Sequence, residues 1–275
     1  MENLIRGFKE NKAFRISSCL VFLLLAVTLL APVIAPYDPL DAIMRNANAA
    51  PSAEHLFGTD KLGRDVLSRI LYGASYSLSS VVGLVALIFV VGTTLGVIAG
   101  YSGGIVDTVI MRIADMMISF PGVILAIAIA GILGGSLFNA MVALLCVTWT
   151  KYARLSRSMV LKIKKHDFVS AAIVSGGSSI HILWVHILPN ILPLMIITAA
   201  ADIGAMMMEL AGLSFLGFGS QPPAPEWGLM LNEGRQQLQT APWLMIFPGL
   251  AIFITVVIFN LWGDSLRDVL DPRQD

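Results

Sequence analysis

Two carboxylates lie inside a stretch of the chain that is otherwise almost entirely apolar, residues 190–213. Asp202 stands near its middle and Glu209 follows seven residues later, so both lie on one face of a helix with ~3.6 residues per turn. An ionised Asp at the centre of a membrane-spanning helix costs roughly 2.5 kcal/mol or more, so this face must point to protein or to water. We expect Asp202, Glu209 and the nearby Met206 to line a passage for a polar solute. Two alternatives stay open: Glu209 reaches the outer interface, or Met206 fills the core.

The chain lacks the residue patterns of the common catalytic and metal sites. No GxxxxGK[ST] loop and no Gly-Lys pair occurs, so the chain itself is not expected to hydrolyse ATP. No Ser-His-Asp set or pair of carboxylates stands out. His181 and His186 are five residues apart, about 140° around a helix, which disfavours a shared metal and favours packing. Cys19 and Cys146 fall inside apolar runs without CxxC spacing. We therefore predict no enzyme activity and no metal or cofactor in this chain.

The composition is that of a membrane protein. Hydrophobic residues make up 56% of the 275 positions and charged residues only 13%, whereas soluble domains average roughly 45–50% and about 25%. The formal net charge is zero, so no overall basic field points to nucleic acid. The predicted fold class is an all-α polytopic membrane protein in a lipid bilayer.

Apolar runs near the ~20 residues of a spanning helix recur along the chain, and only the fourth is short. The first run, from Ile16 to about Pro36, could also be a cleaved signal peptide. Its length, and the proline directly after Ala35, favour an uncleaved helix instead. The six predicted spans are 16–36, 78–101, 117–134, 137–152, 190–213 and 243–263.

Lysine and arginine gather on one side of the predicted spans, and this side is inside because such residues cross membranes poorly. Six crossings place the basic amino terminus and the basic loop after the fourth span on the same side. Thirteen of the eighteen basic residues then lie inside, leaving Arg45, Lys61, Arg64, Arg69 and Arg235 outside. The predicted partition is a cytoplasmic amino terminus (1–16), a first span (17–36), an outer segment with an interfacial helix (37–77), a core with five spans (78–264) that includes the inner loop 153–189, and a cytoplasmic carboxyl terminus (265–275).

Three details of the connecting segments can be predicted. Val66 and Ile70, with charged residues between them, indicate the interfacial helix, although a solvated loop fits the pattern equally well. Arg112 and Asp115, before the third span, are three residues apart and could pair on a helix. The loop after the fifth span contains Gly and Pro. Either its residues 213–219 re-enter the membrane region and line the outer mouth of the pathway, or the loop lies on the surface.

The inner loop contains a stretch typical of a docking element. Ala171 and Ala172 are small, and Ala172 and Gly176 are four residues apart, so one side of a short helix there would let another protein approach closely. Pro189 and Pro193 then end this element and start the next helix, because proline is tolerated in a helix's first turn. The stretch, residues 167–193, is DFVSAAIVSGGSSIHILWVHILPNILP.

The order Ala-Ala, three residues, Gly and then Leu-Pro resembles the cytoplasmic "EAA" loop of importer-type ABC permeases. Ser170 stands where that family usually has Glu, and His186 where it often has an apolar residue. Four further strings resemble the peptide and nickel branch of the family, and the resemblance covers nearly all of the chain from Asp38 onward: HLFGTDKLGRDVLSRILYGASYSL, RIADMMISFP, LSFLGFG and PEWGLMLNEGR.

The resemblance implies a type I ABC importer transmembrane domain in a bacterial or archaeal cytoplasmic (inner) membrane, with both termini cytoplasmic. It implies four kinds of partner: a second homologous permease that forms a heterodimer with this chain, two cytoplasmic ATPases that bind ATP and Mg, an extracytoplasmic substrate-binding protein, and the lipid bilayer. It also implies that Ser170, Ala171, Ala172 and Gly176 belong to a coupling helix that contacts the ATPase, where the missing Glu removes a charged contact. The implied substrates are small peptides (di- or oligopeptides) or nickel and other metal chelates.

Two other classes remain as alternatives. An ion- or proton-coupled secondary transporter or channel would also have several spans and buried carboxylates, but it typically shows internal repeats, and no convincing repeat is found. A membrane-embedded hydrolase is disfavoured by the missing catalytic residues.

Overall fold

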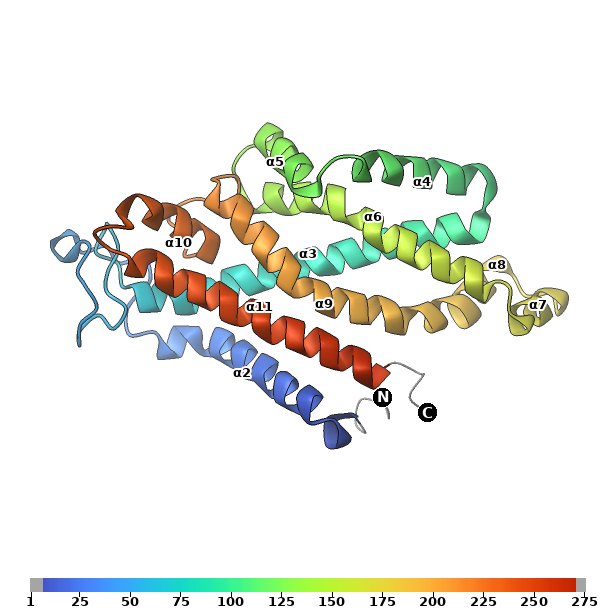
Figure 1. Ribbon diagram of the computed structural model, residues 1–275, viewed down its shortest axis with the longest axis horizontal. Coiled ribbons are helices and arrows are strands. Elements are labelled where there is room, and N and C mark those ends of the chain that lie inside the picture. The colour runs from blue at the N-terminus through green and yellow to red at the C-terminus, as the bar shows by residue number, and fades with distance from the viewer. Residues whose placement is uncertain (1–6, 271–275) are drawn as a thin grey trace.

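The computed structural model describes residues 7–270, and these residues are almost entirely helical. Figure 1 shows most of the long helices running along the long axis of the molecule. The loop of residues 35–65 and α10 (Trp227–Gly234) lie at one end, and α7 (Asp167–Val174) lies at the other. We call these the α10 end and the α7 end. The described residues contain no β-strand beyond one isolated bridge between Thr59 and Asp65, so the prediction of an all-α fold is confirmed.

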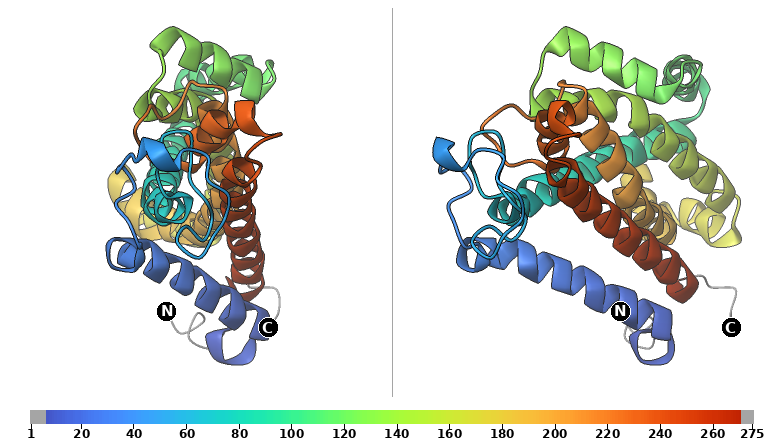
Figure 2. Two further views of the ribbon diagram at one scale, coloured as in Figure 1. Left: turned by 90° about the vertical axis from the view of Figure 1, so that its left-hand side faces the viewer. Right: turned by 60° about the vertical axis from the view of Figure 1, so that its left-hand side comes forward.

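Within the described residues, four helices are long and apolar enough to cross a membrane. They correspond to the first, second, fifth and sixth predicted spans, so the polytopic architecture is confirmed. α2 lies along the edge of the bundle beside α11 (Figure 2). The four helices are α2 (Lys12–Ile34), α3 (Val66–Ser102), the segment Ser179–Phe215 that contains α9 (Leu188–Phe215), and α11 (Trp243–Leu270).

The predicted third span, 117–134, is not one helix. α4 (Gly104–Ile118) and α5 (Gly122–Leu133) are bent by 93° at a break of three residues that ends in Pro121, which cannot donate a helical hydrogen bond. At ~1.5 Å per residue neither piece reaches the ~30 Å of a bilayer core, so only the bent pair together could form a fifth span. The residues between the second and third predicted spans are therefore largely the helix α4.

Two further predicted boundaries shift. The fourth predicted span, 137–152, is the first part of α6 (Leu137–Ile163), which continues for eleven more residues into the predicted inner loop. The predicted interfacial helix is not a separate element, because Val66 is the first residue of α3 and is fully buried. Asp65 caps this helix by accepting a hydrogen bond from the Ser68 N–H.

α3 and α6 pack unusually closely because three glycines of α3 face α6. Gly92, Gly96 and Gly100 are spaced by four residues and so lie on one face of α3. A Cβ atom at Gly96 would lie 2.0 Å from Ser156 Oγ and 2.2 Å from the Ala153 carbonyl oxygen. Small residues at such spacing let helix backbones approach closely in membrane proteins. These three glycines, which we call the glycine stripe, let α6 pack directly against the backbone of α3.

α9 begins in an irregular way that explains how it accommodates two prolines. α8 (Ser179–His181) leads without interruption into a π-helical turn (η2, Ile182–Ile187) and then into α9. Pro189 lies in the first turn of α9, as predicted, but Pro193 lies inside the helix. The π-helical turn widens the hydrogen-bonding pattern before these residues, whose nitrogens cannot donate.

The start of α2, α7 and the end of α11 all lie toward the α7 end of the molecule (Figure 1). The basic residues of α6 beyond residue 152 approach the same end, whereas the 35–65 loop lies at the other. This arrangement has the two-sided character that the distribution of lysine and arginine predicts.

Substituting Gly96 with alanine should destabilise the protein by roughly 1–3 kcal/mol, because the new methyl group meets backbone of α6 that cannot move aside. Gly83 of the same helix is the matched control, since the nearest atom to its Cβ would be Met141 Cε at 3.8 Å. Thermal unfolding of the purified protein measures both variants. Equal melting temperatures for Gly96→Ala and Gly83→Ala would contradict the close contact.

Candidate functional sites along the bundle

Asp202 is buried and is held by two side chains of α6. Lys151 Nζ lies 2.6 and 2.9 Å from the two carboxylate oxygens, and Tyr152 donates its hydroxyl to Oδ2 at 2.9 Å. Asp202 is 8% exposed and Tyr152 is 1% exposed, whereas the Lys151 side chain is 55% exposed. The sequence predicted that Asp202 faces either protein or water, and in the structure it faces protein side chains. Lys151 lies in the part of α6 that was predicted as the fourth span.

The other two candidate residues of α9 have different surroundings. Met206 is 4% exposed and belongs to the main hydrophobic core, which also holds Leu84 and Ile88 of α3. Glu209 is half-buried, and the described residues offer it no hydrogen bond or ion pair. A carboxylate without a partner inside an apolar helix is a candidate contact for a solute or for another subunit. The proposed lining role of these residues remains a prediction.

Two ion pairs join α4 to α6. Arg154 pairs with Asp115 at 2.5 Å, and Arg157 binds Asp107 through Nε and a terminal nitrogen at 2.5 and 2.6 Å. The predicted pairing of Arg112 with Asp115 is therefore wrong, because Asp115 points across to the neighbouring helix. Sequence spacing could not reveal a partner 39 residues away.

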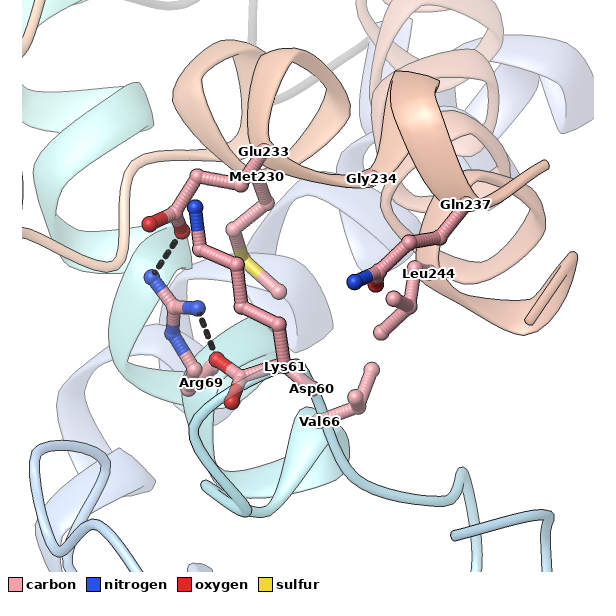
Figure 3. A pocket seen from close by; sticks show the side chains of 9 residues that line it. All are labelled: Asp60, Lys61, Val66, Arg69, Met230, Glu233, Gly234, Gln237 and Leu244. Carbon is pink, nitrogen blue, oxygen red and sulfur yellow. Dashed lines mark hydrogen bonds and ion pairs between the residues drawn. The ribbon is translucent and has the colours of Figure 1, made fainter. Parts of the chain in front are cut away.

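The α10 end contains a buried cluster of four charged side chains, Asp60, Arg64, Arg69 and Glu233, which we call the charged quartet. Asp60 accepts from Arg64 Nε at 2.7 Å and from Arg69 at 2.5 Å. Glu233 of α10 accepts from Arg69 at 2.9 Å (Figure 3) and from Arg64 at 3.2 Å. Both arginines are at most 2% exposed, and two cations balance two anions. The quartet ties the outer loop to α3 and α10, so these arginines are not on an interfacial surface as predicted.

Two acidic caps complete the α10 end. Asp65 accepts from the Ser68 backbone and hydroxyl, both at 2.8 Å, and binds His55 Nδ1 at 2.9 Å. Glu226 caps α10 by accepting from the N–H groups of Gly228 and Leu229 at 2.8 and 2.9 Å. Burial raises the pKa of the Glu226 carboxyl above its ordinary value, although these two hydrogen bonds act in the opposite direction.

Gly176 does not share a helical face with Ala172, because α7 ends at Val174. Gly176 has φ +81°, a backbone conformation that favours glycine. Its N–H donates to the Ile173 carbonyl, and the Gly177 N–H donates to the Ala172 carbonyl, both at 3.0 Å. These two bonds form a Schellman cap. Gly176 therefore terminates the helix, and the predicted small-residue face is wrong in this respect.

α7 is anchored to the bundle through one side and exposes apolar side chains on the other. Val169 is fully buried in a small core with Val97 of α3, Val160 of α6 and Ile191 of α9. Ala172 is half-buried, whereas Ser170 and Ala171 are exposed. The large apolar side chains exposed around α7 are Phe168 (44%), Ile173 (52%), Val174 (88%), Ile180 (70%) and Trp184 (67%). Exposed apolar side chains at this density are typical of an interaction surface.

His181 and His186 contact each other, contrary to the expectation from a regular α-helix. Their ring centroids lie 5.9 Å apart in an edge-to-face arrangement, and Phe168 lies 6.2 Å from His186. The π-helical turn between them has more residues per turn than an α-helix, so residues five apart return to one side. The predicted packing role fits these contacts. Among the described residues no group of three or more His, Cys, Asp or Glu side chains could hold a metal ion.

The loop after α9 is a compact turn. The Gly217 N–H donates to the Ser214 carbonyl and the Phe218 N–H to the Leu213 carbonyl, at 3.0 and 2.9 Å. Phe215 and Phe218 are half-buried. Whether residues 213–219 line a passage stays a prediction.

Two family models together match most of the chain. The family model described as "Binding-protein-dependent transport system inner membrane component" matches residues 92–275. A second model, "N-terminal TM domain of oligopeptide transport permease C", matches residues 2–51.

Curated relatives cover nearly the whole chain. A dipeptide transport system permease protein of Alkalihalophilus pseudofirmus is 43% identical over 98% of this chain and 88% of its own length. A nickel transport system permease protein of Escherichia coli is 40% identical over 94% of both chains. A glutathione transport system permease protein of Pectobacterium atrosepticum is 43% identical over 98% of this chain and 89% of its own. A solved structure of the MetNI methionine ABC transporter shares the fold, with TM-score 0.59 and 20% identity, over 74% of this chain and 97% of its own.

The ion pair between Lys151 and Asp202 can be tested with a double-mutant cycle. Asp202→Asn and Lys151→Gln should each destabilise the protein. The loss in free energy of unfolding of the double variant should be smaller than the sum of the two single losses, by roughly 0.5–3 kcal/mol. The more exposed pair Arg154–Asp115 serves as the control, with an expected coupling of roughly 0–1 kcal/mol. Additive losses at Lys151 and Asp202 would show that the two side chains do not interact.

Proposed function

The chain belongs to the family of binding-protein-dependent transport system inner membrane components, and we propose that it forms half of the translocation pathway of an ATP-driven importer for small peptides or metal chelates. The observation that carries this proposal is the identity of 40–43%, over nearly the full chain, to permease subunits of dipeptide, nickel and glutathione transporters. This similarity favours an ABC importer permease over a secondary transporter or channel. The three relatives differ in cargo, so the class of solute is proposed rather than one compound.

We infer that ATP is hydrolysed by partner subunits. Permeases of this family work with ATPases and with a substrate-binding protein. We propose that two cytoplasmic ATPases bind ATP and Mg, and that a second, homologous permease completes a heterodimer in the membrane. The absence of a phosphate-binding loop in the sequence supports this division. The α7 end would face the cytoplasm together with both termini, which agrees with the gathering of basic residues there.

We propose that α7 is the surface through which the ATPase moves this chain. Its exposed apolar side chains fit a helix-in-groove contact, and Ser170, Ala171 and Ala172 lie on the same short helix. Gly176 contributes by ending the helix, since its positive φ sets the direction of the chain that follows. Because Val169 belongs to one small core together with residues of α3, α6 and α9, a push on α7 would reach all three helices as one body.

We propose that the middle of α9 contributes to the translocation pathway through Glu209. Asp202 and Met206 hold this part of α9 in place. Asp202 is already held by Lys151 and Tyr152, and Met206 is packed in the core. Glu209 is the carboxylate of this face that remains available for a cationic group of a solute, such as a peptide amino group. A charged hydrogen bond of this kind contributes roughly 1.5–3 kcal/mol.

Val174→Asp should abolish stimulation of the partner ATPases while the protein still inserts into membranes. The change places a carboxylate in the centre of the apolar docking surface, where it would be desolvated without a partner. Leu56→Asp is the matched control, because Leu56 is 60% exposed at the opposite end. ATP-driven uptake by proteoliposomes of the complete transporter measures the effect. Normal uptake by the Val174 variant would remove α7 from the coupling surface. Gly176 is less suitable for this test, because any side chain there also strains the turn.

Glu209→Gln should lower the uptake rate roughly tenfold without changing assembly, because the amide cannot pair with a cationic group. Glu54→Gln, an exposed acid of the outer loop, is the control. Uptake and co-purification of the partner subunits are measured in parallel. An unchanged rate in the Glu209 variant would exclude this carboxylate from the pathway.

A further inference from the structure

A polar cavity of about 250 Å³ lies at the α10 end, next to the charged quartet. The turn after α9, the second half of α10 and the outer loop contribute its walls. Glu233 belongs both to this cavity and to the quartet, and Lys61 lines the cavity as well. Figure 3 shows Lys61 and Glu233 beside a smaller neighbouring pocket that they also line. The cavity is close to the lower end of the roughly 300–1,000 Å³ of known ligand pockets, so it suits a small solute.

Two cations of this cavity have no partner of opposite charge among the residues that the structure describes. Asp60 and Glu233 are balanced by Arg64 and Arg69, so the quartet neutralises itself. Lys61 of the outer loop and Arg235, just after α10, also line the cavity, and both are exposed. Within residues 7–270 neither side chain makes an ion pair or a hydrogen bond. The cavity therefore carries two uncompensated positive charges, which attract an anion.

Two amide side chains of the cavity keep their oxygen atoms available. Gln221 donates through its nitrogen to the Gly219 carbonyl at 3.0 Å, and Asn232 donates through its nitrogen to the Phe215 carbonyl at 2.5 Å. No donor among the described residues contacts the oxygen of either amide. Such oxygens accept hydrogen bonds from an ammonium group. Cations and acceptors together match a zwitterion better than a simple anion.

We propose that this cavity is a subsite for the free carboxylate of a small solute, held by Lys61 and Arg235 before the solute enters the bundle. The proposal rests on the proposed function and specifies the chemistry of its substrate. Carboxylate is common to short peptides and to organic metal chelators, and the acceptors Gln221 and Asn232 favour the peptide, which also carries an ammonium group. Arginine can bind a carboxylate through two parallel hydrogen bonds, and lysine adds a point charge.

Binding can be measured without the substrate-binding protein. The complete transporter in nanodiscs is titrated with alanyl-alanine, with alanyl-alanine amide and with citrate, and its melting temperature is recorded. We expect stabilisation by the dipeptide, weaker stabilisation by citrate and none by the amide. Lys61→Gln and Arg235→Gln should each raise the apparent Kd for the dipeptide roughly tenfold, since each removes a charge-assisted hydrogen bond. Arg45→Gln, a basic residue of the outer loop outside the cavity, should leave the Kd unchanged.

Four results would overturn the proposal. Equal stabilisation by the dipeptide and its amide, or no stabilisation by either carboxylate, would show that the carboxylate is not recognised. Unchanged dipeptide affinity in the Lys61 and Arg235 variants would place binding elsewhere. A higher half-saturating concentration of binding protein in these variants, with unchanged dipeptide affinity, would assign the two cations to the protein partner. ATP-driven uptake by proteoliposomes of the same transporter tests the proposed function separately, because no uptake by the unsubstituted transporter would contradict the proposed function itself.

Discussion

The close approach of α3 and α6 is the constraint on which the other sites depend. Three glycines of α3 contribute no side chain to this contact, so α6 packs directly against main-chain atoms of α3 that cannot repack. From this position α6 presents Lys151 and Tyr152 to Asp202 of α9, and Arg154 and Arg157 to α4. A helix displaced by the width of one methyl group would misplace all of these pairs at once.

The two ends of the molecule are built for different tasks. At the α7 end a short capped helix is attached through Val169 to the ends of three long helices and leaves apolar side chains exposed. At the α10 end the charged quartet joins the outer loop, α3 and α10 through buried, mutually balanced charges. Breaking one partner of such a buried set leaves an uncompensated charge, so the quartet also opposes separation of these elements. In our account force enters at the first end and solute at the second.

Local sequence patterns predicted the helical class, the positions of four spanning helices and the gathering of basic residues at one end. They failed wherever the outcome depends on residues distant in sequence. A carboxylate at position 202, inside an apolar run, predicted that this face of the helix is buried. Its partner Lys151 could not be identified, because it lies 51 residues earlier, at the end of another apolar run where a lysine resembles an interfacial anchor. The spacing of Arg112 and Asp115 suggested a pair on one helix, whereas a neighbouring helix supplies Arg154. α-Helical spacing places His181 and His186 on different sides of the helix, whereas the π-helical turn between them brings their rings together. Gly92, Gly96 and Gly100 did carry a readable signal, the four-residue spacing of small residues in an apolar helix.

The central claim is that α3 and α6 move as one body when the ATPases act on α7. It is tested most directly by the distance between spin labels at Val90 of α3 and Ser158 of α6, both exposed, in the complete transporter with and without ATP. We predict the same distance distribution in both states, because the glycine stripe permits no sliding between the two backbones. A shift of the mean distance of about 5 Å, roughly one helical turn, would contradict the account.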